Sequence, residues 1–381
     1  MNFKKILPQL LTLVVVILVF GFFSYNAQVN MENRGITFGY GFLSQESSFD
    51  VQFSLIEYDG SHSYFRAYLV GLLNTILVSV IGIVFATIIG VIVGIARLSS
   101  NYLIERTAAI YVEFFRNIPL LLQIFFWYFA ALRALPLPEK AEPMFGVFFL
   151  TIKGFFVPAF VWNNLDIFIY SVIAAIVAIV FVRLYAKKKQ ENQGIQTPVL
   201  SISIGLLIIL PLLSFFLGGV DATVEIPVIK QLSQTSFTYE GGLKLPPELI
   251  SLALALSLYT ATFIAECVRA GVQGVSKGQK EAAASIGLTP NQVLKLVVMP
   301  QALRIIIPPT TNQYLNLTKN SSLAAAIAYP DLVLVFAGTA LMQTGRAIEI
   351  VSITMLTYLT LSITISIFMN WYNKKIAIKE K

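Results

Sequence analysis

Residues 271–304 read GVQGVSKGQKEAAASIGLTPNQVLKLVVMPQALR, a long polar stretch in an otherwise apolar chain. The run Glu-Ala-Ala-Ala that begins at Glu281 consists of good helix formers. Gly287 can end that helix, because glycine tolerates the left-handed conformation at C′. Thr289 then suits an N-cap, Pro290 the first helical position and Gln292 the third, which together make a capping box. The stretch predicts a helix, a glycine corner and a second short helix.

The second short helix is amphipathic. Val293, Leu294 and Val297 share one apolar face, and Pro300 predicts a break before the next helix. Such a face must be buried somewhere. It could lie on the surface of a bilayer or in a groove on a partner protein. The spacing alone favours neither.

Composition places this stretch in a membrane protein. Of the 381 residues, 56% are hydrophobic and only 12% are charged, whereas soluble domains carry about 25% charged residues. Cys267 and His62 are the only cysteine and histidine. An intrachain disulfide and a metal site built from cysteines or histidines are therefore excluded, and we expect neither a metal nor a cofactor.

Crossing the hydrocarbon core takes about 20 mostly apolar residues, and eight segments qualify. The third is interrupted by Pro119, and the first is predicted to be an uncleaved helix. Span two also carries Gly71, Gly82, Gly90 and Gly94, which should allow close helix packing. The predicted spans are Ile6–Phe23, Ala67–Ala96, a segment within Thr107–Leu132, Ile167–Val182, Val199–Val220, Leu249–Cys267, about Leu303–Ala328 and Ile350–Trp371.

The basic residues orient these spans. Lys and Arg accumulate on cytoplasmic loops, and most of them fall on one side of the membrane if both termini are cytoplasmic. The net charge of +7 is then a topology signal rather than a sign of nucleic-acid binding. The stretch 271–304 lies on the cytoplasmic side in this arrangement. We therefore expect an all-α polytopic protein with about eight transmembrane helices.

The polar stretch also resembles a known sequence pattern. Glu281, Ala282 and Ala283 are followed after three residues by Gly287, and then after nine by Val297, Met299 and Pro300. This spacing resembles the EAA loop of bacterial ABC importer permeases. The resemblance implies that residues 271–300 form a cytoplasmic coupling loop that docks on a separate ATPase subunit. No G-x-x-x-x-G-K-[ST] phosphate loop occurs in this chain, so we expect a non-catalytic subunit.

Further segments resemble the polar amino-acid uptake family of permeases. They are Phe115–Trp127, Tyr259–Arg269, Gln301–Pro309 and Leu315–Leu323. The resemblance covers roughly residues 68–132 and 247–372. The long segment between them is similar to that of the general L-amino-acid and glutamate/glutamine/aspartate/asparagine permeases. It implies a type I ABC importer permease fold in the inner membrane of a bacterium, a second and related permease subunit, and a periplasmic amino-acid-binding protein.

The domain organisation follows from these assignments. Residues 1–66 hold the first transmembrane helix and a periplasmic loop, and residues 67–372 hold the permease domain with an inserted segment, 133–246. Residues 373–381 form a cytoplasmic tail. We see no separate soluble domain.

Polar residues inside the spans are candidates for the substrate path. Lys319 could bind an α-carboxylate, or it could neutralise an acidic neighbour or extend toward a membrane surface. Arg116 could face substrate or pair with Glu113. Glu266 could meet an α-ammonium group, although an ion pair with Arg269 is the more economical reading. The full candidate set is Arg116, Asn117, Gln123, Glu266, Lys319, Asn320, Ser321 and Ser322.

Two other classes of protein compete with an ATP-driven permease. An ion-coupled secondary amino-acid transporter would need carboxylates near the middle of the membrane and no docking loop. The spans here are nearly free of Asp and Glu at their centres. A membrane-embedded enzyme would need acid–base pairs or metal ligands at the membrane surface, and the sequence shows none.

Overall fold

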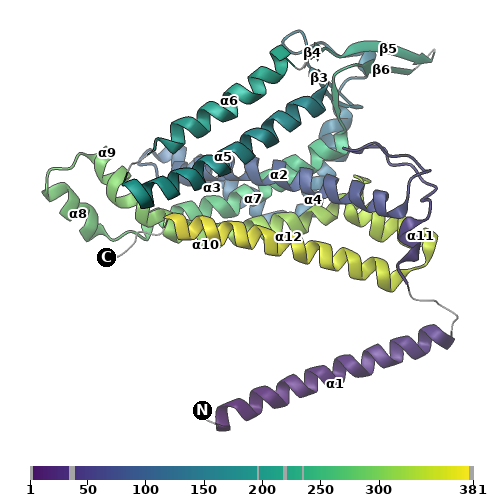
Figure 1. The fold of residues 1–381 in the computed structure, drawn as a ribbon, viewed down its shortest axis with the longest axis horizontal. Helices are drawn as coiled ribbons and strands as arrows, with labels where there is room; N and C mark the ends of the chain where they lie inside the picture. Colours follow the sequence, from purple (N-terminus) through teal and green to yellow (C-terminus); the bar gives the residue numbers. More distant parts are fainter. Residues whose placement is uncertain (1–2, 34–38, 195–196, 218–220, 234–235, 377–381) are drawn as a thin grey trace. The chain divides into compact units, whose positions relative to one another are not determined.

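The structure is a computed structural model that describes residues 3–33, 39–194, 197–217, 221–233 and 236–376. Within these residues, seven helices are long and apolar enough to cross a membrane, and a bent pair can count as an eighth. The predicted helical membrane fold is confirmed (Figure 1). The predicted tail beyond residue 376 lies outside the described residues. The seven helices are α1 (Phe3–Asn33), α2 (Tyr64–Ala96), α5 (Leu165–Gln193), α6 (Val199–Leu217), α7 (Pro247–Gln273), α10 (Met299–Asn320) and α12 (Ala347–Ile376).

The chain forms two compact units. One contains residues 1–124 and 252–381, and the other contains residues 125–251. The first unit therefore joins segments that lie far apart in the sequence.

Close approach of α2 to its neighbours organises the first unit. A Cβ atom added to Gly90 would lie 2.7 Å from the side chain of Ile264, and one added to Gly94 would lie 2.7 Å from that of Val268. Both partners belong to α7. Only glycine leaves room for such contacts. The close packing predicted from these glycines is confirmed.

The third predicted span is broken. It consists of α3 (Tyr102–Asn117) and α4 (Leu120–Phe125), and the two parts of the span meet at an angle of 101°. Between them Ile118 is extended, with φ −93° and ψ 126°. Proline disfavours the helical conformation in the residue before it, so Pro119 causes this bend.

The end of the polar stretch, from Pro290 on, and the seventh predicted span form one run of helix that ends at Ile327. After α8 (Lys277–Ser285) come α9 (Pro290–Gln292), a π-helical turn over Val293–Val298, α10 and a 3₁₀ helix over Ser321–Ile327. The break predicted at Pro300 is wrong. Pro300 lies in the first turn of α10, where a proline is tolerated, and the wider π turn before it leaves room for the proline ring.

Beyond Ile327 the helix gives way to a short turn. Ala328 adopts the left-handed conformation, with φ +60°. A π-helical segment, Val333–Ala340, then leads through α11 (Leu341–Thr344) to α12. The sequence analysis did not predict this turn.

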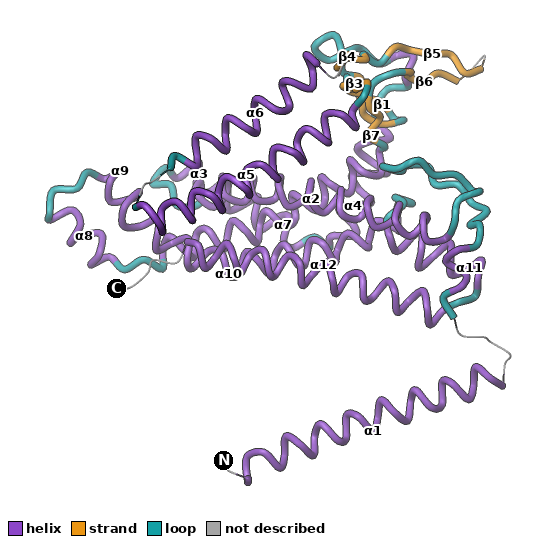
Figure 2. Tube along the Cα trace, viewed as in Figure 1, coloured by secondary structure: helices purple, strands orange, loops and turns teal. Residues whose placement is uncertain are grey.

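The second unit contains α5 and α6, which run side by side (Figure 1). The described residues also form strands that the sequence analysis missed, all at one end of this helix pair (Figure 2). They make three antiparallel sheets: β1–β2–β7, β3–β4 and β5–β6. Their bounds are β1 (Phe149–Thr151), β2 (Gly154–Val157), β3 (Ala159–Asn163), β4 (Asp221–Glu225), β5 (Val228–Ser233), β6 (Ser236–Glu240) and β7 (Leu243–Leu245).

A small aromatic core holds the strands together. Phe156 and Tyr239 are both buried, and their ring centroids lie 4.8 Å apart. The hydroxyl of Tyr239 donates to the carbonyl of Pro138 at 2.9 Å. Burial of an aromatic side chain with its polar tip satisfied is a favourable arrangement, and burial raises the pKa of Tyr239 above its ordinary value.

Candidate functional site: the coupling corner and a groove between two helices

The end of α8 is a glycine corner, as predicted. Gly287 has φ +86°. Its N–H donates to the carbonyl of Ala284 at 2.9 Å, and the N–H of Leu288 donates to the carbonyl of Ala283 at 3.3 Å. This is the Schellman pair of hydrogen bonds. The corner thus depends on a conformation that an L side chain adopts at a cost.

The start of α9 carries both bonds of the predicted capping box. The N–H of Gln292 donates to Oγ1 of Thr289 at 3.4 Å, and the N–H of Thr289 donates to Oε1 of Gln292 at 2.9 Å. Pro290 occupies the first turn. We refer to residues 281–300 as the coupling corner.

The apolar residues of the coupling corner divide into two groups. Ala283 is buried, Val297 is half-buried, and Val293 packs against a core of Val275, Val298 and Ala302. Four large apolar side chains remain exposed, and the sequence did not single out two of them, Ile286 and Leu296. The four are Ile286, Leu294, Leu296 and Met299, which are 78%, 48%, 61% and 39% exposed.

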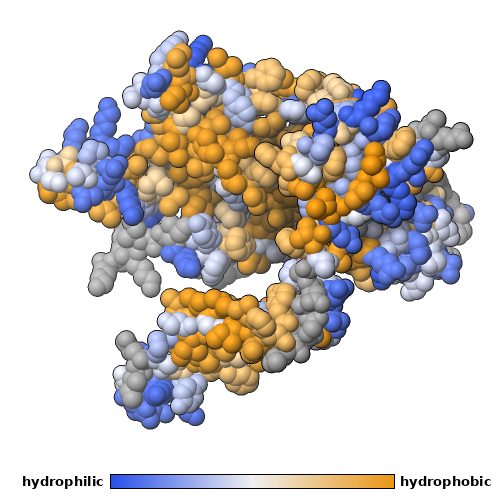
Figure 3. Space-filling model, turned by 90° about the horizontal axis from the view of Figure 1, so that it is seen from above, coloured by the Kyte–Doolittle hydropathy of each residue, from blue (hydrophilic) through white to orange (hydrophobic). Residues whose placement is uncertain are grey.

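This exposure stands out against its surroundings. The end of the molecule that carries α8 and α9 is largely hydrophilic (Figure 3). Glu281 and Ala282 are exposed there too. Exposed apolar side chains with a polar rim are typical of an interaction site.

Glu266 lies in an ion-pair cluster. Its carboxylate pairs with Arg97 at the end of α2, and its Oε2 atom lies 3.0 Å from Nη2 of Arg269. The interaction between Glu266 and Arg97 links α7 to α2. The structure therefore favours the structural reading of Glu266 over contact with an α-ammonium group.

Three of the predicted candidates lie at the bend between α3 and α4. Gln123 is buried, and its Nε2 donates to the carbonyls of Phe115 and Ile118 at 2.8 and 2.9 Å. Gln123 thus satisfies backbone groups released by the bend. Arg116 and Asn117 are exposed, and the guanidinium of Arg116 lies 5.0 Å from the ring centroid of Phe263. Within the described residues, Arg116 and Glu113 form no ion pair.

Lys319 opens into a groove of about 490 Å³ between α10 and α12, which we call the Lys319 groove. Lys319 is exposed, and in the part of the chain that the structure describes no carboxylate lies within 4.0 Å of its ammonium group. The groove is lined by Lys319, Ser322, Val333, Thr354, Met355, Tyr358, Leu359 and Ser362.

The two serines and the asparagine beside Lys319 point in different directions. Ser322 lines the groove. Ser321 is fully buried, and its hydroxyl donates to the carbonyl of Thr318 at 2.7 Å. Asn320 is half-buried and is not part of the lining. Of the four consecutive candidates at positions 319–322, Lys319 and Ser322 line the groove.

A second cavity, of about 220 Å³, follows along the same pair of helices. We call it the amide pocket, because three asparagines line it. On α10 and the 3₁₀ helix that follows it, positions 308, 312, 315, 319 and 322 belong to one or the other cavity, and a spacing of three or four residues places them on one face. The amide pocket is lined by Ile307, Pro308, Thr311, Asn312, Leu315, Ser366, Met369, Asn370 and Asn373. None of these asparagines was among the predicted candidates. Asn370 and Asn373 lie at the predicted end of the eighth span, whereas Asn312 lies inside the seventh.

No family model matches the chain, but similar proteins extend along its full length. A putative amino-acid ABC transporter permease protein of Escherichia coli, YhdX, is 48% identical over 98% of this chain and 94% of that protein. The general L-amino acid transport system permease protein AapQ of Rhizobium johnstonii is 46% identical over 100% and 94%. The glutamate/glutamine/aspartate/asparagine transport system permease protein BztB of Rhodobacter capsulatus is 39% identical over 100% and 95%.

Proposed function

Since the chain belongs to the family of amino-acid ABC transporter permeases, we propose that it forms part of the pore of an importer for general polar L-amino acids. Family membership makes the chain a permease subunit rather than an enzyme, and it places the chain in the inner membrane. It also decides against an ion-coupled secondary transporter. The observation that carries the choice of substrate is the similarity, over nearly the whole chain, to the general and the acidic-and-amide amino-acid permeases.

We propose three partners for this subunit. One is an ATPase that seats the coupling corner, because Ile286 and Leu294 present apolar surface on an otherwise hydrophilic end and a groove on a partner would cover them. A second, related permease would complete the pore. A periplasmic amino-acid-binding protein would deliver the substrate.

The substrate path is proposed to run along the face shared by α10 and α12. Among the described residues no carboxylate pairs with Lys319, and such a cation suits the α-carboxylate that every amino acid carries. The amide pocket that follows carries no ionisable side chain among its lining residues. A charge-free, hydrogen-bonding surface would pass acidic, neutral and basic side chains alike, which fits a general amino-acid importer.

Uptake by the reconstituted complex tests this function. The permease, its ATPase, its partner permease and its binding protein are placed in liposomes, and ATP-dependent uptake of L-glutamate, L-glutamine and L-arginine is measured. Lys319→Met should lower uptake of all three by about 10- to 100-fold, because a hydrogen bond to a charged group is worth about 1.5–3 kcal/mol.

Lys187→Met is the matched control, because Lys187 is exposed on α5 and its one ion pair among the described residues is with Glu191 of its own helix, at 3.9 Å. It should leave uptake unchanged. Equal kinetics for the Lys319→Met variant and the parent would contradict the proposed path. Failure of the parent complex to take up any of the three amino acids would contradict the proposed substrate class.

A further inference from the structure

The turn of residues 328–332 is an irregular piece of backbone between two helical segments. Tyr329, Asp331 and Leu332 are each 0% exposed. Ala328 holds the left-handed conformation, with φ +60°, which is unfavourable for a residue with a Cβ atom. Such strain persists only where the surroundings enforce it. Irregular backbone in a membrane protein also needs neighbours to satisfy its polar groups.

Helix α2 supplies those neighbours. Nδ2 of Asn74 donates to the carbonyl of Pro330 at 2.9 Å, and Oγ1 of Thr75 accepts from the N–H of Leu332 at 3.0 Å. The hydroxyl of Tyr329 donates to the carbonyl of Asn74 at 3.0 Å. Three hydrogen bonds from two consecutive residues thus clamp the turn to α2.

Gly71 lets the turn come this close. A Cβ atom at Gly71 would lie 2.9 Å from Cα of Leu332 and 3.1 Å from the carbonyl oxygen of Asp331. Both are backbone atoms, so the turn itself would have to shift. Gly71 lies one turn of helix before Asn74 and Thr75, and the three residues form one seat for the turn.

Asn74 makes one more bond, to a different part of the chain. Its Nδ2 also donates to the carbonyl of Phe53 at 2.8 Å, and the rings of Phe53 and Tyr329 lie 6.3 Å apart. Phe53 belongs to the loop between η1 (Gly41–Ser44) and α2. One amide group therefore holds the loop and the turn together. Its own Oδ1 is buried, and among the described residues it finds no hydrogen-bond partner.

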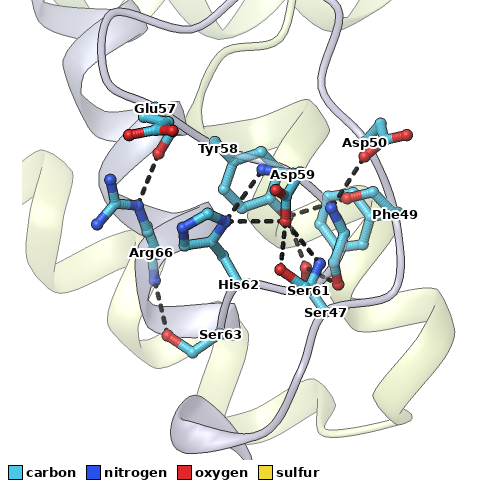
Figure 4. A network of polar contacts seen from close by, with 11 residues as sticks. Ser47, Phe49, Asp50, Glu57, Tyr58, Asp59, Ser61, His62, Ser63 and Arg66 are labelled. Carbon is cyan, nitrogen blue, oxygen red and sulfur yellow. Dashed lines mark hydrogen bonds and ion pairs between the residues drawn. The ribbon is translucent and has the colours of Figure 1, made fainter.

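The loop that contains Phe53 is itself well ordered by hydrogen bonds (Figure 4). The N–H of Gly60 donates to Oδ1 of Asp50 at 2.9 Å, and Nε of Arg66 donates to the carbonyl of Glu57 at 2.7 Å. A loop braced in this way moves as one piece. A displacement of the loop would therefore reach Asn74.

The turn adjoins two cavities along the chain. Ala328 and Pro330 of the turn line a pocket of about 210 Å³, together with Asp50 and Gln52 of the loop. Val333, which follows the turn directly, lines the Lys319 groove. The turn thus joins a segment that faces the loop-side pocket to a segment that faces Lys319.

We propose that the turn of residues 328–332 is the outer barrier of the substrate path and that Asn74 is the positioning residue that holds it closed. Asn74 also links the barrier to the outer loop, so a protein that docks on the loop can act on the barrier through this side chain. The strained Ala328 and the unpaired Oδ1 of Asn74 describe a closed state that is held by its contacts and released when they break. The inference rests on the proposed transport function.

Thiol labelling tests the barrier directly. Cys267 is the only cysteine, so Cys267→Ser with Ser322→Cys leaves a single thiol in the Lys319 groove. The full complex is placed in vesicles, and a membrane-impermeant maleimide is added on the side that carries the loop. Labelling should be slow in this parent. It should become at least tenfold faster when Asn74→Leu or Thr75→Val is added, because each removes hydrogen bonds of the clamp.

Asn26→Leu is the matched control, because among the described residues Nδ2 of Asn26 donates to the carbonyl of Phe22 in its own helix and to no other group. It should leave the labelling slow. Thr75→Val is nearly isosteric and keeps the test open if Asn74→Leu does not insert. Fast labelling of the parent, or equally slow labelling of Thr75→Val and the control, would overturn the proposal. Labelling measures the access of the maleimide to position 322 and does not depend on which solute is transported. The labelling result would therefore remain valid even if the proposed amino-acid uptake were not observed.

Discussion

Replacement of Gly287 by alanine should weaken binding of the ATPase subunit to this permease. Gly287 has φ +86°, and no atom lies within 4 Å of the position that a Cβ atom would take. The only penalty is therefore conformational. It is about 1–2 kcal/mol for an L side chain in this region, which corresponds to roughly a 5- to 30-fold loss in the population of the corner.

That loss should appear in binding. If the ATPase recognises the corner as the structure shows it, its apparent affinity falls by the same factor as the population of the competent form. The assay is a titration of the ATPase subunit onto the permease pair in nanodiscs, with uptake measured in parallel. Asparagine tolerates the left-handed region, so Gly287→Asn should lose less affinity than Gly287→Ala, and the β-branched Gly287→Val should lose more.

Gly278→Ala is the control for this series. Gly278 lies within α8, and open space surrounds its Cβ position as well. Alanine there removes a weak point of the helix and contributes about 0.5–1 kcal/mol of stability. The reasoning would be refuted by equal affinities for Gly287→Ala and Gly278→Ala. An order of affinities that places valine above asparagine at position 287 would refute it equally.

Two further outcomes follow from the described contacts. Glu266→Ala should lower the melting temperature of the purified chain, because it leaves Arg97 and Arg269 without their shared carboxylate. We expect a loss of about 2–3 kcal/mol in the free energy of unfolding, at or below the low end for buried pairs because the group is partly exposed. Glu113→Ala should show no change, and equal melting temperatures for the two variants would count against the structural role of Glu266. The hydrogen bonds from Ser61 hold the pKa of the Asp59 carboxyl below its ordinary value of 3.8, so the stability that Asp59 lends the outer loop is present above that value and is lost as pH falls through the lower, folded-state pKa. Limited proteolysis of the loop from pH 7 down to pH 3 should show this loss in the parent and not in Asp59→Asn, and identical profiles would contradict it.

The features that the sequence predicted well are those specified by neighbouring residues. The corner at Gly287, the capping box of Thr289 and Gln292 and the bend at Pro119 each arise within a few positions of the chain. Backbone sterics and short-range hydrogen bonds decide such features. Pro300 was misread because the sequence does not show the π-helical turn before it. A proline next to a regular α-helix predicts a break, and the π-helical turn that accommodates Pro300 leaves no distinct signal in the sequence.

The features that the sequence could not predict depend on distant partners. Asn74 and Pro330 lie 256 positions apart, and nothing local to either residue indicates the bond. The strands of the second unit pair β2 with β7 across two helices, and their short, aromatic-rich segments resemble an irregular loop. The groove at Lys319 needs α12 as its second wall. Polarity identified Lys319 as a candidate, but only the packing separated it from Gln123 and Glu266.

The helical run from Pro290 to Ile327 also constrains the number of residues between the coupling corner and Lys319. Residues 290–327 form a single candidate span, with the coupling corner at one end and Lys319 near the other. Because a helix turns by about 100° per residue, one residue inserted between them would rotate Lys319 out of its groove or twist the corner away from its partner. Removing seven residues, close to two full turns, would nearly restore the phase. Homologous chains should therefore keep the number of residues between the coupling corner and Lys319.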